Sequence, residues 1–306
     1  MQTTALTPYA HLPRAHHDHH VLTSTVDVFG VAQWLLAEHA PQPGGDARVF
    51  DALVVSVHPD GAVGLTELRA VRARWPHLDR LPDGGFVVAA SRARRYEDGN
   101  QVQLFDGLGQ ETSSFSVGDA IEHLLVDEAG LIWVGHFDEN PSGIRRWSTT
   151  GHPMWASDSA DIPGLFDCYA LNVSGTTAWA CTYTDFPLAE IRPDRREQPV
   201  RVWTNQIRGA KAVAVHGDQV AFYGGYGEEQ DRLAHGQLTK SSIEPTHVGL
   251  LTLPDGTARA ADGSSAEEAG STSRPSRSPR GACSTSAADT RRWRDASARG
   301  RWSSTG

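Results

Sequence analysis

The chain has little of what would mark a secreted, membrane or nucleic-acid-binding protein. Its 306 residues include three cysteines, too few for a disulfide framework and in keeping with a reducing compartment. The N-terminus, MQTTALTPYAHLPRAHHDHH, lacks the apolar stretch of a secretory signal, and no segment approaches the roughly 18 apolar residues of a membrane helix. The formal charge of -9 makes a nucleic-acid partner unexpected. We therefore predict a cytoplasmic protein without membrane contact, although secretion without a leader stays open.

Motifs for common enzyme chemistries are also missing. The sequence has no Gly-rich phosphate loop, no nucleophile elbow and no His-Glu-x-x-His pattern. We predict no cofactor, and we expect a non-enzymatic protein rather than an enzyme.

What the sequence does have is a repeat. A hydrophobic strand, a polar turn ending in glycine and a second hydrophobic strand recur around Gly85, Gly130, Gly175 and Gly217, at intervals of 45, 45 and 42 residues. A period of about 40–50 residues in an all-β sequence is typical of propeller blades. Each blade is a small sheet that cannot bury both faces alone, so the repeat predicts the whole architecture.

The clearest unit covers residues 120–151. It begins with the strand and turn AIEHLLVDEAG, in which Asp127 can bond the backbone ahead of it and Gly130 can adopt positive φ. The nearly continuous apolar strand LIWVGHF follows, and IRRWSTTG reads as a third strand. Weaker copies before residue 255 bring the expected number to about five four-stranded blades. Only VAQWLLAEHA has helical character, and it is short.

The C-terminal 49 residues differ from the rest. Residues 258–306 contain no Val, Ile, Leu, Phe, Tyr or Met, and nine arginines there face five acidic residues. Such a segment cannot bury enough apolar surface to offset the entropy of ordering it, so we predict that residues 258–306 are a disordered tail. The rest of the chain divides into a flexible His-rich segment at 1–20 and a propeller at 21–257. The tail's Ala/Ser/Arg-rich composition favours a shifted reading frame near residues 255–260, which would make the chain a truncated, non-functional propeller. A native disordered tail and a basic tail that contacts nucleic acid or an acidic partner are the alternatives.

One stretch carries a family resemblance. Residues 120–151 resemble one repeat of the bacterial regulator-type propellers, with Asp127, Gly130, Trp133 and Gly143 at matching positions. Such repeats are also similar to NHL and WD40-like blades. The resemblance implies a propeller fold, and propellers of this sort often serve as sensing or docking modules.

Loops at one end of the blades form the expected binding face. It would combine residues from the second-to-third-strand loops and one blade-to-blade connection. The residues we assign to it are His136, Asp138, Glu139, Asp167, Tyr183, Asp185, Tyr223 and Tyr226. We expect this face to bind a protein or a small-molecule ligand, although loops of this composition are also ordinary solvated turns.

A metal-dependent reading uses the same face. Lactonase-like propellers hold a divalent cation at the axis through Glu, Asn and Asp from different blades, and Asp138 and Asp185 could mimic part of such a set. No Asn and Glu at equivalent offsets complete the set. We therefore keep a metal-dependent hydrolase as the alternative and not as the preferred function.

Other clusters have simpler readings. The histidines at 11, 16, 17, 19 and 20 match no zinc spacing, and their segment could instead supply a strand that closes the ring. Cys168 and Cys181 lie symmetrically about a turn and could face each other across a hairpin, where two buried thiols are expected. Trp133 and Trp179, at similar offsets from their glycines, read as wedges between blades.

Overall fold

The computed structural model describes residues 2–39, 49–93, 101–137, 143–157 and 166–252. In these ranges the chain forms five sheets, four of which have four antiparallel strands each, while the fifth has an added strand. The strands are β1 (Gln2–Ala5), β2 (His20–Val26), β3 (Ala32–Ala37), β4 (Phe50–Val57), β5 (Val63–Val71), β6 (Pro76–Arg80), β7 (Phe86–Ala90), β8 (Val102–Phe105), β9 (Glu111–Phe115), β10 (Ile121–Val126), β11 (Ile132–His136), β12 (Ile144–Trp147), β13 (Pro153–Ala156), β14 (Phe166–Ser174), β15 (Thr177–Tyr183), β16 (Leu188–Ile191), β17 (Val200–Trp203), β18 (Ala212–His216), β19 (Gln219–Tyr223), β20 (Arg232–Leu238) and β21 (Ile243–Thr252). Two short 3-10 turns, η1 (Arg14–His16) and η3 (Gly227–Glu229), complete the elements.

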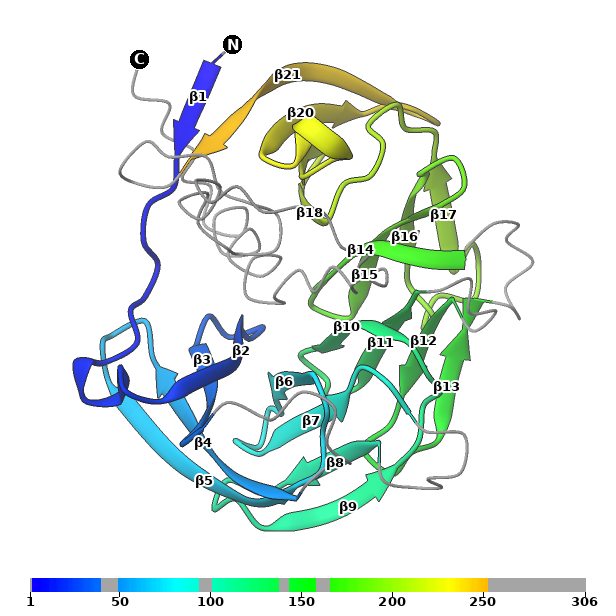
Figure 1. The fold of residues 1–306 in the computed structure, drawn as a ribbon. Coiled ribbons are helices and arrows are strands. Elements are labelled where there is room, and N and C mark those ends of the chain that lie inside the picture. The colour runs from blue at the N-terminus through cyan, green and yellow to red at the C-terminus, as the bar shows by residue number, and fades with distance from the viewer. Residues whose placement is uncertain (1, 40–48, 94–100, 138–142, 158–165, 253–306) are drawn as a thin grey trace, which may run out of the picture.

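The five sheets are blades around a common axis. Figure 1 shows them side by side in chain order as a ring sector, with the first strand of each blade nearest the centre. These inner strands contact one another in sequence, β2 with β6, β6 with β10, β10 with β14 and β14 with β18. The predicted all-β propeller of about five four-stranded blades is therefore confirmed. The segment with helical character is strand β3, because its apolar residues are covered on both faces of the first blade.

The Asp-x-x-Gly turn is a hydrogen-bonded unit. The Oδ1 atom of Asp127 accepts the backbone N–H groups of Ala129 and Leu131 at 3.0 and 2.9 Å. Gly130 then adopts a φ of +83°, in the left-handed region that favours glycine. Asp27 builds the same turn in the first blade, where its Oδ1 accepts the N–H groups of Phe29 and Val31, both at 2.9 Å. The motif residues of the repeat thus serve the fold.

One predicted turn glycine has a different role. In the second blade Gly84 has the positive φ, at +92°, and not Gly85. A Cβ on Gly85 would collide with the backbone carbonyl oxygen of Phe105, so this position needs glycine for close approach of the neighbouring strand.

The core lies between blades. Separate clusters of buried apolar side chains fill the spaces between the first and second, second and third, third and fourth, and fourth and fifth blades. Cys168 belongs to the cluster toward the third blade, whereas Cys181 belongs to the one toward the fifth. The two thiols therefore lie on opposite faces of their sheet and do not face each other, because β-bulges near Cys168 shift its register against β15. Burial raises the pKa of Cys168 above its ordinary value and that of Cys181 to about 12, so both are unreactive thiols.

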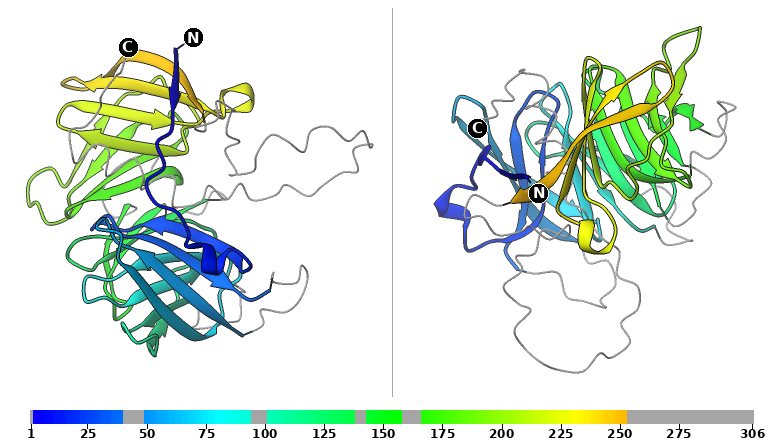
Figure 2. Two further views of the ribbon diagram at one scale, coloured as in Figure 1. Left: turned by 90° about the vertical axis from the view of Figure 1, so that its left-hand side faces the viewer. Right: turned by 90° about the horizontal axis from the view of Figure 1, so that it is seen from above.

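The N-terminal segment joins the last blade to the first. Strand β1 pairs in parallel with the outer strand β21 of the fifth blade, and Leu6 packs against a cluster of buried apolar side chains of that blade. Three residues further on, the Tyr9 hydroxyl donates to the backbone carbonyl of Gly30 in the first blade, at 2.6 Å. Figure 2 shows this segment running from one blade to the other. The segment does supply a strand to the sheets.

Two predictions concern residues that the structure does not describe. The predicted tail and the possible shift of reading frame fall on residues 253–306, outside the described residues. Within the ranges that the structure describes, no helix has the length and apolar character needed to cross a bilayer.

Candidate functional site

The loops that join second to third strands lie at one end of the blades. Tyr183 ends β15, Tyr223 ends β19 and His136 ends β11, so these predicted residues share that end. Asp185 follows Tyr183 in its loop, and Asp167 lies at the start of β14, which pairs with β15. Asp138 and Glu139 lie outside the described residues.

Four aromatic rings from the fourth and fifth blades meet at this end. The Tyr169 ring lies 6.1 Å from that of Tyr183, 5.1 Å from that of Phe186 and 6.0 Å from that of Tyr226, centroid to centroid. Phe186 also contacts Tyr183 and Tyr226 edge to face, at 5.7 and 5.9 Å. We call these four residues the tyrosine patch. Aromatic pairs at such separations stabilise one another, so the patch is a preformed surface.

Part of the tyrosine patch is open to solvent. Tyr183 is 39% and Tyr226 48% exposed, whereas Phe186 is buried at 2% and anchors the group from below. Phe166, 50% exposed, lies opposite Tyr183 in the sheet register and extends the aromatic surface. A contiguous exposed aromatic surface of this kind is typical of an interaction site.

Charged groups surround the tyrosine patch. The Lys211 Nζ atom lies 4.6 Å from the Tyr169 ring centroid in a cation–π contact. On the acidic side, Asp185, Glu228 and Glu229 are exposed in the adjoining loops. Partial burial and the hydrogen bond with Tyr169 raise the pKa of Tyr226 above its ordinary value, and Asp167 contributes in the same direction. Tyr226 is therefore a neutral phenol at physiological pH.

Two predicted surface residues lie inside the protein. Tyr223 is 3% exposed, and its hydroxyl donates to Asp231 at 3.2 Å. His136 is fully buried, with Nδ1 at 2.9 Å from the backbone carbonyl of Asp119, and burial lowers its pKa. Neither side chain is placed to contact a ligand on the face itself.

The geometry offers no metal centre in the parts of the chain that the structure describes. No three His, Cys, Asp or Glu side chains there lie close enough to hold one ion. This includes Asp185 and the N-terminal histidines, of which His16 and His19 contact each other through their rings at 5.6 Å. Asp138, which the metal-dependent alternative pairs with Asp185, lies outside the described residues.

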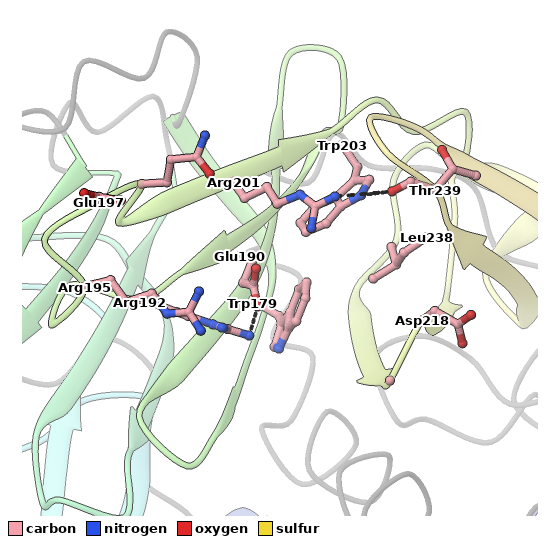
Figure 3. Close-up of a pocket in the computed structure, with 12 residues that line it drawn as sticks. Trp179, Glu190, Arg192, Arg195, Glu197, Arg201, Trp203, Asp218, Leu238 and Thr239 are labelled. Atoms are coloured by element: carbon pink, nitrogen blue, oxygen red, sulfur yellow. Dashed lines mark hydrogen bonds and ion pairs between the residues drawn. The ribbon is translucent and has the colours of Figure 1, made fainter.

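A cavity of about 460 Å³ lies at the opposite end of the strands, between the fourth and fifth blades. Figure 3 shows side chains from the β16–β17 turn on one side of it and residues of the fifth blade on the other. Trp179, predicted as a wedge between blades, lines this cavity, whereas Trp133 is fully buried. We did not predict this cavity from the sequence, nor did we assign Tyr169, Phe186 and Lys211 to the loop face.

Comparison with known proteins supports no closer assignment than the fold. No family model matches the chain, and no curated protein matches it. Solved structures similar to it include a streptogramin B lyase, with 11% identity, a TM-score of 0.46 and coverage of 78% of this chain and 74% of that one. A putative 6-phosphogluconolactonase from Bacteroides fragilis has 10% identity, a TM-score of 0.47 and coverage of 82% and 77%. The propeller domain of Cps50 (Swd1) from Myceliophteria thermophila has 12% identity, a TM-score of 0.47 and coverage of 78% and 75%.

These similarities say nothing about activity, since proteins with unrelated functions share the fold. The five radial sheets and the recurring Asp turn lead to one conclusion. The chain is a β-propeller repeat protein with four-stranded blades.

Proposed function

We propose that this chain is a non-enzymatic docking module that binds a protein partner through the tyrosine patch. The observation that carries the proposal is the set of four mutually contacting rings, two of them exposed, at the loop end of the blades. Tyrosine contributes large contact area at low entropic cost and is enriched among the residues that dominate binding energy. Here Phe186 already fixes the rings, so little order has to be gained on binding.

The charges around the tyrosine patch indicate which side chains a partner should present. The exposed carboxylates of Asp185 and Glu228 lie in the two loops that carry Tyr183 and Tyr226. Ring faces beside carboxylates suit an arginine or lysine side chain, which gains both a cation–π contact and an ion pair. Lys211 already covers Tyr169, so the exposed rings of Tyr183 and Tyr226 are the ones available. We therefore propose a partner segment in which a basic residue stands next to apolar ones.

A displayed library of random peptides tests this function. Peptides selected on the wild-type chain should be enriched in arginine or lysine beside apolar residues. Their affinity should fall by about tenfold or more for Tyr226→Ala, because truncating a central aromatic anchor costs roughly 2 kcal/mol.

The matched control is Leu108→Ala. Leu108 is 82% exposed on the β8–β9 turn at the opposite end of the strands, so its loss removes apolar surface without touching the patch. Selected peptides that bind wild type, Tyr226→Ala and Leu108→Ala with equal affinity would remove the tyrosine patch as the docking surface.

A further inference from the structure

The cavity between the fourth and fifth blades opens to solvent, and aromatic and charged side chains line it. Its volume of about 460 Å³ falls within the range of small-molecule pockets. It lies at the turn end of the strands, away from the tyrosine patch, and four separate segments line it. The proposed docking function makes no use of it.

One wall is a supported indole ring. The Trp179 and Trp203 rings lie 5.8 Å apart, and the Trp203 Nε1–H donates to the backbone carbonyl of Thr239 at 2.9 Å. Trp203 is 2% exposed and fixed, whereas Trp179 is half-buried and lines the cavity. In Figure 3 the Trp179 ring stands between the β16–β17 turn and Leu238. A planar or apolar group in the cavity would rest on this ring.

Three arginines line the cavity, and they are not equivalent. The Arg201 guanidinium is held 4.2 Å above the Trp203 ring and donates to the backbone carbonyl of Lys240 at 3.1 Å. Arg192 forms an ion pair with Glu190, but its Nε–H is buried and has no hydrogen-bond acceptor among the described residues. Arg195 is exposed and makes no ion pair with any described residue. Arg195 thus carries a charge with no ion-pair partner among the described residues, and the Arg192 guanidinium is partly exposed beside Glu190.

The side chains of the turn point in different directions. Figure 3 shows Arg192 and Arg195 reaching from the turn toward Trp179, while the Glu197 carboxylate lies at the far end of the turn. Asp218 stands across the cavity on the fifth blade, and its Oδ2 atom accepts a hydrogen bond from Gln237 at 3.0 Å. The cavity therefore has guanidinium groups beside the carboxylates of Glu190 and Glu197 on one side and an indole face in the middle, while the Asp218 carboxylate points away from Trp179.

We propose that this cavity binds a small organic anion, a phosphate or carboxylate joined to a planar ring. The anionic group binds the exposed guanidinium of Arg195 and the partly exposed guanidinium of Arg192, because guanidinium groups match carboxylate and phosphate oxygens in pairs. The ring rests on Trp179. An inorganic anion alone is a poorer ligand, since Glu190 already offsets one of the two charges and the indole face would stay unused.

Calorimetric titration with phenyl phosphate and with benzoate tests the proposal and separates the two anion types. At least one of these probes should bind, more tightly than inorganic phosphate and more tightly than neutral benzyl alcohol. Failure of both aromatic anions to bind, or binding of inorganic phosphate as tight as that of phenyl phosphate, would overturn it.

Variants then locate the binding. Arg195→Gln should weaken it by about fivefold, the worth of one exposed charged contact. Trp179→Phe keeps a ring and should bind, whereas Trp179→Leu should not, and thermal unfolding checks that both variants fold. The matched control is Arg74→Gln, because Arg74 also stacks on a tryptophan, at 4.0 Å from the Trp75 ring, but lies outside the cavity. Equal losses for Arg195→Gln and Arg74→Gln would refute the site, and neither result depends on the tyrosine patch.

Discussion

Two neighbouring spaces between blades are built on equivalent strand pairs, but one is filled by side chains and the other contains a cavity. Between the third and fourth blades, Trp133 pairs across strands with Arg146; in the next blade, Trp179 pairs in the same way with Glu190. The first space is closed, and Trp133 is fully buried. The second contains the cavity that Trp179 lines. The comparison shows how a propeller repeat can keep its backbone and change what lies between blades.

Arg146 closes the first space. Its guanidinium, 3% exposed, donates to Asp127 at 3.1 Å and to both carboxylate oxygens of Asp194 at 3.1 Å, and it lies 5.3 Å from the Trp133 ring centroid. Asp194 belongs to the β16–β17 turn, the turn whose other side chains line the cavity. In the fourth blade the position of Asp127 is held by Ser174 and that of Arg146 by Glu190. Without a buried arginine and its partners, the second space stays open.

The largest effect should come from breaking the closed space. Arg146→Met leaves the Asp127 carboxylate buried without its cation, and removal of one partner of a buried ion pair typically costs about 3–5 kcal/mol. The free energy of unfolding from denaturant titration measures this cost. Asp194→Asn is the matched variant, because Asp194 is 68% exposed and its loss should cost under about 1 kcal/mol.

Adding Asp127→Asn to Arg146→Met should restore part of the lost stability, since the uncompensated buried charge is then gone. If Arg146→Met costs no more than Asp194→Asn, the closed space does not depend on the buried ion pair.

The next effect is acid sensitivity between the same two blades. His123, on β10, is buried. It lies beside Gly135 and Cys168, which pack so closely that a Cβ on Gly135 would collide with Cys168. Burial, with His77 and Lys211 acting in the same direction, lowers the pKa of His123 to about 3. The folded chain therefore keeps this ring neutral, whereas the unfolded chain takes up a proton below about pH 6.5. From that pH down to about 3, His123 should cost the folded state about 1.4 kcal/mol per pH unit.

Unfolding free energies at several pH values, for wild type and His123→Gln, isolate this contribution. The difference between the two proteins should change with pH below 6.5, with wild type losing stability faster. His216→Gln, at the exposed last residue of β18, should leave the slope of wild type unchanged. Parallel pH profiles for wild type and His123→Gln would contradict the assignment.

The sequence reveals the closed space better than the open one. The repeat, the Asp127–Gly130 turn and the buried Trp133 are local features, since a turn and the alternation of a strand depend on neighbours in the chain. The cavity depends on two blades. Arg192 and Arg195 lie in the polar stretch RPDRREQP, which by itself reads as a solvated turn. They line a cavity only because the fifth blade places Leu238 and Asp218 opposite them.

The loop face shows the same limit. Tyr183 and Tyr226 were predicted there because loop residues of adjoining blades share one end of a propeller. Tyr169 was missed, since it lies on a strand whose register two bulges shift, and its contact with Tyr226 crosses between blades. Tyr223 was misleading for a different reason. Its position at a strand end suggests exposure, but its ring packs inside with Leu233 and Leu251.

The smallest effect sharpens the comparison at the open space. Glu190→Gln removes the charge that engages Arg192 and should release that guanidinium for an anion in the cavity. Phenyl phosphate should then bind about threefold more tightly than to wild type, while the free energy of unfolding falls by less than about 1 kcal/mol, because the Arg192 side chain is 32% exposed. Glu67→Gln, which removes one of the two exposed partners of Arg69 on the first blade, should change neither quantity measurably. Weaker binding after Glu190→Gln would mean that Glu190 orients Arg192 for the ligand. The glutamate that the fourth blade has in place of Arg146 would then help to bind the ligand, and would not merely neutralise Arg192.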